Sequence, residues 1–229
     1  MIIVHHDDTP VRHRATMPPV LNVPPLPDTI AGIAVPQDDV SAATWGWAHR
    51  SLPDYLLQHS IRAYCWGAAI GAGEGLPYDA HVMWTASLMH DIGLTRIPRN
   101  TRCFEVEGGE IARRFLVDHG MSTETAEVVA TAIVLHMQPS VTLEDGAEAI
   151  LLDRATGLDV RGVGFGLVDA VRPDVMRAYP RRAFDRHFLA AITREASVRP
   201  DCQSARLVHR VGIAESMARS PWAKDQTAS

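Results

Sequence analysis

The residues that could do chemistry are histidines and carboxylates that stand among apolar neighbours. The chain has 11 histidines, and histidine is both the commonest metal ligand and an acid–base group near neutral pH. His90 and Asp91 are adjacent and lie within the otherwise apolar run 88–94. Burying an ionised carboxylate is costly unless a charge or a metal ion compensates it. We therefore expect the pair at the C-terminal end of a buried helix, beside a bound cation.

A second histidine, His59, is placed to meet this pair. His59 precedes the glycine-rich segment 71–75 by about a dozen residues, and His90 follows Pro77 by about a dozen. At a rise of about 1.5 Å per residue, each lies roughly 18–20 Å from the turn, so an antiparallel helical hairpin brings both to the same height. Two histidines and a carboxylate form a ligand set that suits Zn²⁺, Fe²⁺ or Mn²⁺.

Three later residues could complete the site. His136 ends the apolar run 130–135, Asp159 is a carboxylate among apolar neighbours, and Thr156 lies three positions before Asp159. Thr156 and Asp159 share a face if that segment is helical, but the height argument does not extend to these residues. Each also has a plainer interpretation, because His59 and His136 could be hydrogen-bonded core residues and Asp159 a helix cap. Only the combination favours a metal site.

The elements that must position these residues are helices. From Trp45 onward, apolar residues recur at intervals of three and four, and no alternating strand-like runs with hairpin turns occur. We predict an all-α fold, a helical bundle in one domain over residues 45–229. Beyond the two helices that carry His59 and His90, we expect helices at about 106–119, 123–137, 145–157, 165–176, 181–198 and 203–218.

Residues 1–44 have a different composition. Seven of the 15 prolines fall within the first 40 residues, and proline lacks an amide donor and fixes φ. This segment is therefore predicted to be an extended arm. We interpret its histidines, His5, His6 and His13, as solvated residues and not as a metal-binding tract.

Composition bounds the remaining possibilities. With 46% hydrophobic residues and a net charge of −5, the chain is typical of a globular protein that has no basic field for nucleic acid or a membrane surface. The uncharged run 63–73 is too short to span a bilayer. Three widely spaced cysteines without a CxxC pair predict neither a disulfide framework nor a zinc knuckle, and the N-terminus lacks the features of a signal peptide. We expect a cytoplasmic protein with a small-molecule substrate, and a homo-oligomer is left open.

The order of these motifs resembles the HD-domain metal-dependent hydrolase superfamily. The resemblance implies a helical bundle whose divalent metal is bound by His59, His90, Asp91 and Asp159, with Zn²⁺ as the first expectation and Fe²⁺ or Mn²⁺ as alternatives. Within the superfamily, the chain looks like the cyanamide hydratase-like branch over residues 45–200. The segments that carry this likeness are 52–53, 59–64, 88–95, 102–108, 132–136 and 155–160.

The resemblance also suggests a reaction. It implies addition of water to a small nitrile-like substrate, with cyanamide converted to urea as the branch's type reaction. Asp91 is the candidate base, His136 a proton donor or further ligand, and Thr156 a hydrogen-bonding partner of the substrate. Gln58 departs from the Asn that commonly precedes the first histidine, which affects substrate orientation. A mononuclear site is the first expectation, although His119, His136 and Glu107 could serve a second metal.

Three alternatives use the same fold. A phosphohydrolase acting on a nucleotide or other phosphate ester is the main one, and an iron-dependent oxygenase and a metal-stabilised binding module without turnover are the others. Arginine matches phosphate geometry, but arginines after a helix end are also common as solvated dipole partners. The cationic candidates for phosphate binding are Arg62, Arg96, Arg99 and Arg102.

Overall fold

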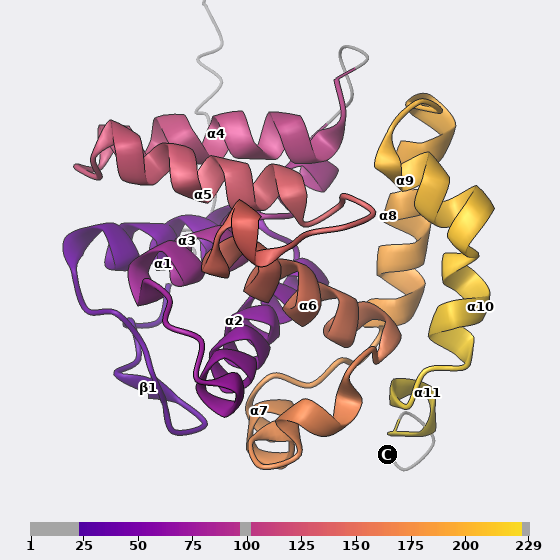
Figure 1. The fold of residues 1–229 in the computed structure, drawn as a ribbon, viewed down its shortest axis with the longest axis horizontal. Coiled ribbons are helices and arrows are strands. Elements are labelled where there is room, and N and C mark those ends of the chain that lie inside the picture. The colour runs from indigo at the N-terminus through magenta and orange to yellow at the C-terminus, as the bar shows by residue number, and fades with distance from the viewer. Residues whose placement is uncertain (1–22, 97–101, 226–229) are drawn as a thin grey trace, which may run out of the picture.

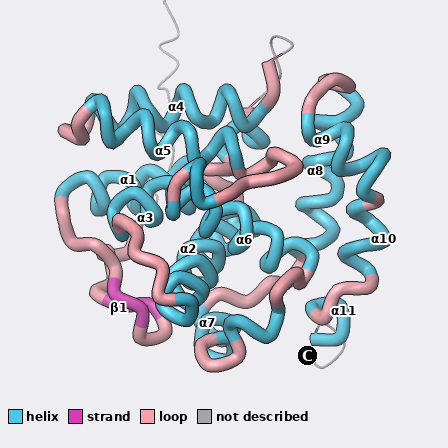
Figure 2. Tube along the Cα trace, in the orientation of Figure 1, coloured by secondary structure: helices cyan, strands magenta, loops and turns pink. Residues whose placement is uncertain are grey.

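A computed structural model describes residues 23–96 and 102–225 of the chain. Helices dominate it, and the strand content is one two-stranded antiparallel ribbon, β1 (Thr29–Ile30) and β2 (Ile33–Ala34) (Figure 2). The all-α prediction is confirmed. The predicted histidine-bearing arm segment, with His5, His6 and His13, lies outside the described residues, and the first regular helix begins at Asp39, within the segment expected to be an arm.

The central part of the bundle is a helical hairpin covered by further helices (Figure 1). Helices α4 and α5 lie side by side across one end of the molecule, and α8 to α10 form a separate layer along one flank. The helices are α1 (Asp39–Ser51), α2 (Asp54–Glu74), α3 (Ala80–Met89), α4 (Phe104–Asp118), α5 (Thr123–Leu135), α6 (Ala147–Arg161), α7 (Arg172–Ala178), α8 (Phe184–Val198), α9 (Gln203–Arg206), α10 (Ile213–Ala218) and α11 (Trp222–Asp225). Short 3₁₀ turns cover Ile92–Thr95, Leu143–Asp145 and Phe165–Val168, and a π-helical turn covers Leu207–Val211.

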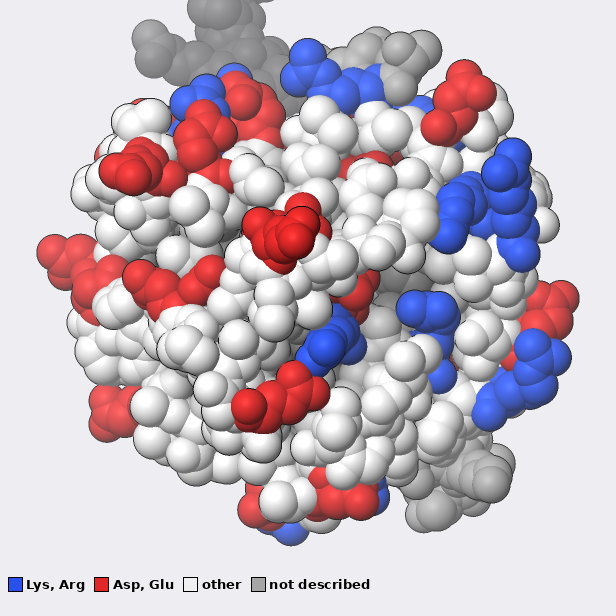
Figure 3. All heavy atoms as spheres, viewed as in Figure 1, with Lys and Arg blue, Asp and Glu red and all other residues white. Residues whose placement is uncertain are grey.

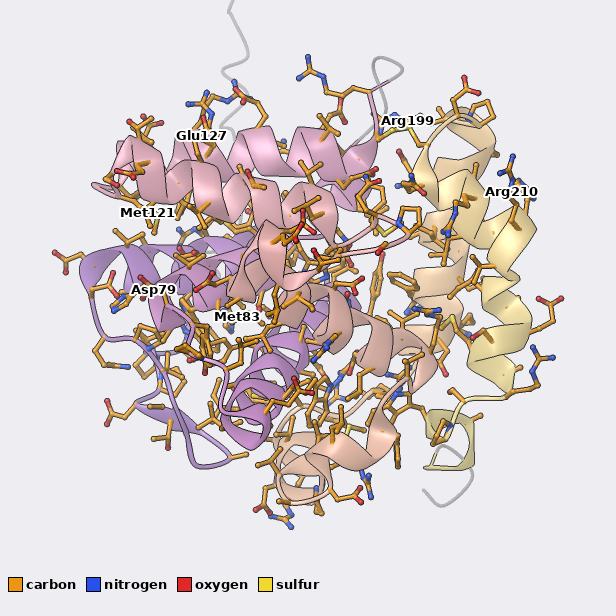
Figure 4. The ribbon with its side chains drawn as sticks, viewed as in Figure 1. Asp79, Met83, Met121, Glu127, Arg199 and Arg210 are labelled. Carbon is orange, nitrogen blue, oxygen red and sulfur yellow. A yellow bond between two sulfur atoms is a disulfide. The ribbon has the colours of Figure 1, made fainter. Side chains whose placement is uncertain are left out.

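Helices α2 and α3 form the antiparallel hairpin expected around the two histidines. Gly75 ends α2 in the left-handed conformation, with φ of 64°, and Asp79 caps α3 by accepting hydrogen bonds from two backbone amides of its first turn. The helices pack closely because Gly67 has no side chain: a Cβ there would lie 2.1 Å from the terminal methyl of Met83, whose position on α3 is labelled in Figure 4.

Two expected helices are interrupted in the structure. The segment 165–176 divides into a 3₁₀ turn and α7, whose first turn contains Pro173. The segment 203–218 divides at Gly212, which has φ of 68° and therefore cannot continue a right-handed helix. Helix α6, by contrast, runs through Gly157 and ends only at the left-handed Gly162, so Thr156 and Asp159 do lie on one helix.

The cysteines correct one expectation. Cys103 and Cys202, separated by 99 residues, form a disulfide, while Cys65 is a buried free thiol. The start of α4 and the α8–α9 junction pack together, as the ion pair between Arg199 and Glu107 at 2.7 Å also shows, and sequence spacing cannot reveal such pairing. Disulfides are rare in reducing compartments, so the cysteines no longer support a cytoplasmic location, which stays a prediction. Among the described residues, no helix is long and apolar enough to cross a membrane.

Candidate metal centre

His59, His90 and Asp91 converge at the core of the molecule. His59 lies in the first half of α2, His90 follows the last residue of α3, and Asp91 begins the turn after it. The two Nε2 atoms are 3.1 Å apart, and Asp91 Oδ2 lies 3.3 Å from Nε2 of His90 and 3.6 Å from Nε2 of His59. All three residues are buried. The predicted meeting of the two histidines at one height in the hairpin is therefore confirmed.

The turn after Asp91 fits tightly against the start of α4. A Cβ on Gly93 would lie 2.0 Å from the backbone oxygen of Phe104, so no other residue fits there without moving the backbone. This contact fixes the turn that carries Asp91 against a second helix. The apolar neighbours seen in the sequence, Ile92 and Leu94, are both buried and hold the turn in the core.

The hydrogen bonds of the histidines show which nitrogens face the centre. His59 donates from Nδ1 to Asp159 Oδ2 at 2.7 Å, His90 donates from Nδ1 to the Ser87 carbonyl at 2.8 Å, and Nδ1 of His136 bonds the Ile133 carbonyl. Because carbonyl and carboxylate oxygens only accept, the proton of each neutral imidazole is on Nδ1. Each Nε2 therefore presents a lone pair on the opposite side of its ring.

Such a group of acceptors needs a cation. Asp91 Oδ2 is buried and accepts no hydrogen bond from the described residues, and one ligand atom from each of His59, His90 and Asp91 fits within 4.8 Å of the others. Burial alone raises the pKa of Asp91, but the neighbouring histidines lower it below its ordinary value, so the group is an anion. Nitrogen lone pairs and a carboxylate with no donor between them are what a divalent metal requires. The residues fit the metal that the sequence predicts.

Asp159 has a different place from the one expected for a ligand. Its two oxygens accept hydrogen bonds from Arg62 Nε and Nη2, from Trp66 Nε1 and from His59 Nδ1, at 2.7–2.8 Å. Burial raises the pKa of Asp159, but Arg62 and Arg181 outweigh it and hold that pKa well below its usual range. Asp159 lies behind His59, on the side away from the converging Nε2 atoms, and orients the ring. The sequence indicates that Asp159 lies in the core, but it does not show which side of the His59 ring Asp159 contacts.

His136 and Thr156 lie at the edge of this group. Nε2 of His136 is 3.8 Å from Asp91 Oδ1, and the ring stands nearly perpendicular to that of His90, with centroids 5.0 Å apart. Burial lowers the pKa of His136 to about 4, with His90 adding to the effect, so the ring is neutral at pH 7. Thr156 donates to the Asp153 carbonyl one turn back. Neither residue belongs to the three-residue ligand group, but both face the same cavity.

That cavity connects the centre to the surface. Its volume is about 210 Å³, and in Figure 3 a hollow is visible between α6 and the C-terminal helices, with basic side chains beside it. One wall comes from α6 and the other from the segment 203–213. Five polar lining residues were not expected from the sequence: Gln138, Asp153, Arg161, Gln203 and Arg206. Only the tertiary packing of residues 203–213 reveals them, although Arg161 stands five residues after Thr156.

The cationic residues predicted from sequence are placed elsewhere. Arg62 is buried against Asp159, Arg96 and Arg102 are exposed and do not line the cavity, and Arg99 lies outside the described residues. The proposed partners of a second metal are also dispersed. His119 is exposed and bonds the Phe115 carbonyl, and Glu107 pairs with Arg199. Within the described ranges, the one group of three metal-ligating residues is His59, His90 and Asp91.

Comparison with known protein families agrees with this geometry. The model of the HD domain matches residues 56–160, a segment that contains the three ligand candidates together with His136, Thr156 and Asp159. This segment of the chain is similar to the HD domain. Members of the HD-domain superfamily are metal-dependent hydrolases, and the site described above has the residues for such a metal. No curated protein matches the chain.

Proposed function

We propose that this protein adds water to a small nitrile-like substrate, as in the hydration of cyanamide to urea. The proposal depends on one observation: His59, His90 and Asp91 offer three ligand atoms within 4.8 Å of one another, and the open side of this group faces a small cavity. Catalytic metal sites typically have three protein ligands and one position left for water or substrate, whereas structural sites are closed by four. Asp159, the expected fourth ligand, is occupied by Arg62, Trp66 and His59.

A divalent metal, with Zn²⁺ as our first choice, would act as a Lewis acid that lowers the pKa of water from about 15.7 towards 7. Zn²⁺ suits two imidazoles and a carboxylate, and Fe²⁺ and Mn²⁺ remain alternatives. A two-histidine, one-carboxylate set also occurs in iron oxygenases, so metal identity is part of the test.

The chain's own groups supply the proton transfers. Hydration of H₂N–C≡N forms a carbon–oxygen bond and moves both protons of water to nitrogen, giving H₂N–CO–NH₂. Asp91 Oδ1 and His136 Nε2 are neighbouring acceptors, 3.8 Å apart, and His136 is neutral at neutral pH because its pKa is about 4. We propose that this pair accepts the proton released on attack, that His136 returns it to the nitrile nitrogen, and that the same pair then carries the proton of the added hydroxyl to that nitrogen. Thr156 lines the same cavity, and we propose that its hydroxyl group forms a hydrogen bond with the substrate.

A phosphohydrolase is the second candidate. It would use the same metal ligands, and the observation that favours it is the presence of Arg161 and Arg206 in the cavity lining, because guanidinium groups bind phosphate oxygens in a bidentate manner. The cavity volume of about 210 Å³ is below the roughly 300–1,000 Å³ of typical ligand pockets, which favours a small ester over a nucleotide.

One assay separates the candidates. The purified protein is loaded with Zn²⁺, Fe²⁺ or Mn²⁺, and urea release from cyanamide is measured beside phosphate release from a panel of phosphate esters. We expect urea release that is lost in His136→Ala and retained in His119→Ala. His119 is a matched control because it also ends a helix and bonds a backbone carbonyl, but is exposed. Phosphate release without urea would refute hydration, and oxygen consumption by the iron form would favour the oxygenase.

A further inference from the structure

Two arginines face the cavity from opposite walls. Arg161 is in the last turn of α6 and Arg206 is the last residue of α9. A Cβ on Gly157 would lie 3.3 Å from Arg161 Nη2, so the guanidinium of Arg161 folds back along α6 towards Gly157, which lies next to Thr156. The absence of a side chain at Gly157 gives the guanidinium this position over the cavity.

Neither guanidinium is neutralised by a contact. Both arginines are half-buried, and no hydrogen bond or ion pair joins either to another residue in the ranges 23–96 and 102–225. Asp153 interacts electrostatically with Arg161 over a longer distance but forms no ion pair with it. Other half-buried or buried arginines of this protein are paired, as Arg199 is with Glu107 and Arg181 with Asp159. Half-buried, unpaired cations that line a cavity favour an anion in that cavity.

We infer that Arg161 and Arg206 form an oxyanion subsite, so that the natural substrate is a nitrile-like compound that carries a carboxylate or phosphate group, which cyanamide itself lacks. The inference deepens the proposed function and rests on it only for the identity of the reacting group. Its physical basis is that a guanidinium offers a planar pair of donors that match a carboxylate or a phosphate. The His59–His90–Asp91 group and the subsite line one cavity of about 210 Å³, which limits the substrate to a small molecule that reaches both.

The segment that carries Arg206 is tied to the body of the protein at several points. Cys202, directly before α9, is bonded to Cys103, and Gln203 Nε2 donates to Gln138 Oε1 across the cavity lining at 3.3 Å. These links hold the α9 wall against the region from which the metal ligands come. The subsite is therefore assembled from two parts of the chain, one inside the HD-domain match and one beyond it.

The test measures anion binding without turnover. Inorganic phosphate and acetate are titrated by calorimetry into wild-type protein and the variants Arg161→Gln, Arg206→Gln and Arg210→Gln, each in the Zn²⁺-loaded form and after chelation of the metal. Arg210 is the control because it lies on the neighbouring π-helical turn but is exposed and points away from the body (Figure 4). We expect binding to weaken about tenfold or more in Arg161→Gln and Arg206→Gln, as for loss of a charge-assisted hydrogen bond, and to stay unchanged in Arg210→Gln.

Comparison of the phosphate and acetate titrations identifies the anionic group of the substrate. Tighter binding of phosphate assigns a phosphate group to the substrate, and tighter binding of acetate assigns a carboxylate. The proposed subsite is refuted if wild-type protein binds neither anion in the Zn²⁺-loaded or the chelated form. It is also refuted if all variants bind the anions as tightly as wild type does. Because binding is measured in the chelated as well as the loaded protein, a missing subsite is distinguishable from a failure of the proposed water addition, which the urea assay reports separately.

Discussion

Replacing Asp159 by Asn tests whether this carboxylate orients His59 or binds the metal itself. In the structure it accepts hydrogen bonds from His59, Arg62 and Trp66 at 2.7–2.8 Å, and it is fully buried. An amide in its place keeps the shape but loses the charge that compensates Arg62, and one of its two polar atoms becomes a donor that opposes the donors around it. His59 and the two remaining ligand residues are unchanged.

The expected losses follow from these contacts. Removing one partner of a buried ion pair costs about 3–5 kcal/mol, so we expect the free energy of unfolding to fall by about that amount. Loss of the carboxylate that orients a metal-binding histidine lowers metal affinity by about 10- to 100-fold. His90→Ala removes a direct ligand, so we expect no stoichiometric metal in that variant.

The measurements are urea unfolding, monitored by circular dichroism, and metal occupancy in competition with a chelator. Asp153→Asn is the matched control, because Asp153 lies on the same helix and lines the cavity, while its side chain makes no hydrogen bond or ion pair with another described residue. We expect that control to keep both wild-type stability and metal. If Asp159→Asn folds but holds as little metal as His90→Ala, the orienting role is refuted and Asp159 is a ligand. If Asp159→Asn keeps the wild-type metal affinity, the hydrogen bond from His59 to Asp159 has no effect on metal binding.

Three further predictions concern the surroundings of the site. Replacing Cys202 by Ser opens a disulfide that closes a loop of 99 residues, so chemical denaturation should show a loss of roughly 2–5 kcal/mol; equal stability of the oxidised wild type and the variant would mean that the bond does not form. Burial raises the pKa of Glu105 from 4.5 to about 7, so its contribution to stability is fully present below pH 4.5 and is lost as the pH rises to about 7. In urea unfolding at pH 8, Glu105→Gln should be more stable than wild type by roughly 3 kcal/mol, with no gain at pH 4.5. An equal gain at both pH values would contradict the raised pKa of Glu105. Gly93→Ala places a Cβ 2.0 Å from the Phe104 carbonyl, and we expect thermal unfolding to show a destabilisation of more than about 1 kcal/mol, whereas Gly73→Ala, with nothing within 4 Å, should have a stability equal to or above that of wild type.

The sequence alone determined the helical class and the place of the main candidate ligands. Apolar residues at helical spacing follow directly from burying one face of each helix, and a His-Asp pair within an apolar run is costly to bury without a cation. The distances of His59 and His90 from one turn also follow from the rise of a helix. For this reason the convergence of His59 with the His90-Asp91 pair could be predicted from residue types and spacing.

Tertiary structure decided everything that depends on how distant segments pack. The predicted role of Asp159 depended on which side of the His59 ring its helix approaches, and the crossing of α2 and α6 places it at Nδ1, against Arg62 and Trp66. The disulfide between Cys103 and Cys202 and the cavity wall that contains Arg206 depend on where α9 and the residue before it pack, and α9 has no periodic signal linking it to the α2–α3 hairpin. Local periodicity reports which face of a helix is buried, but only the packed chain shows which residues that face meets.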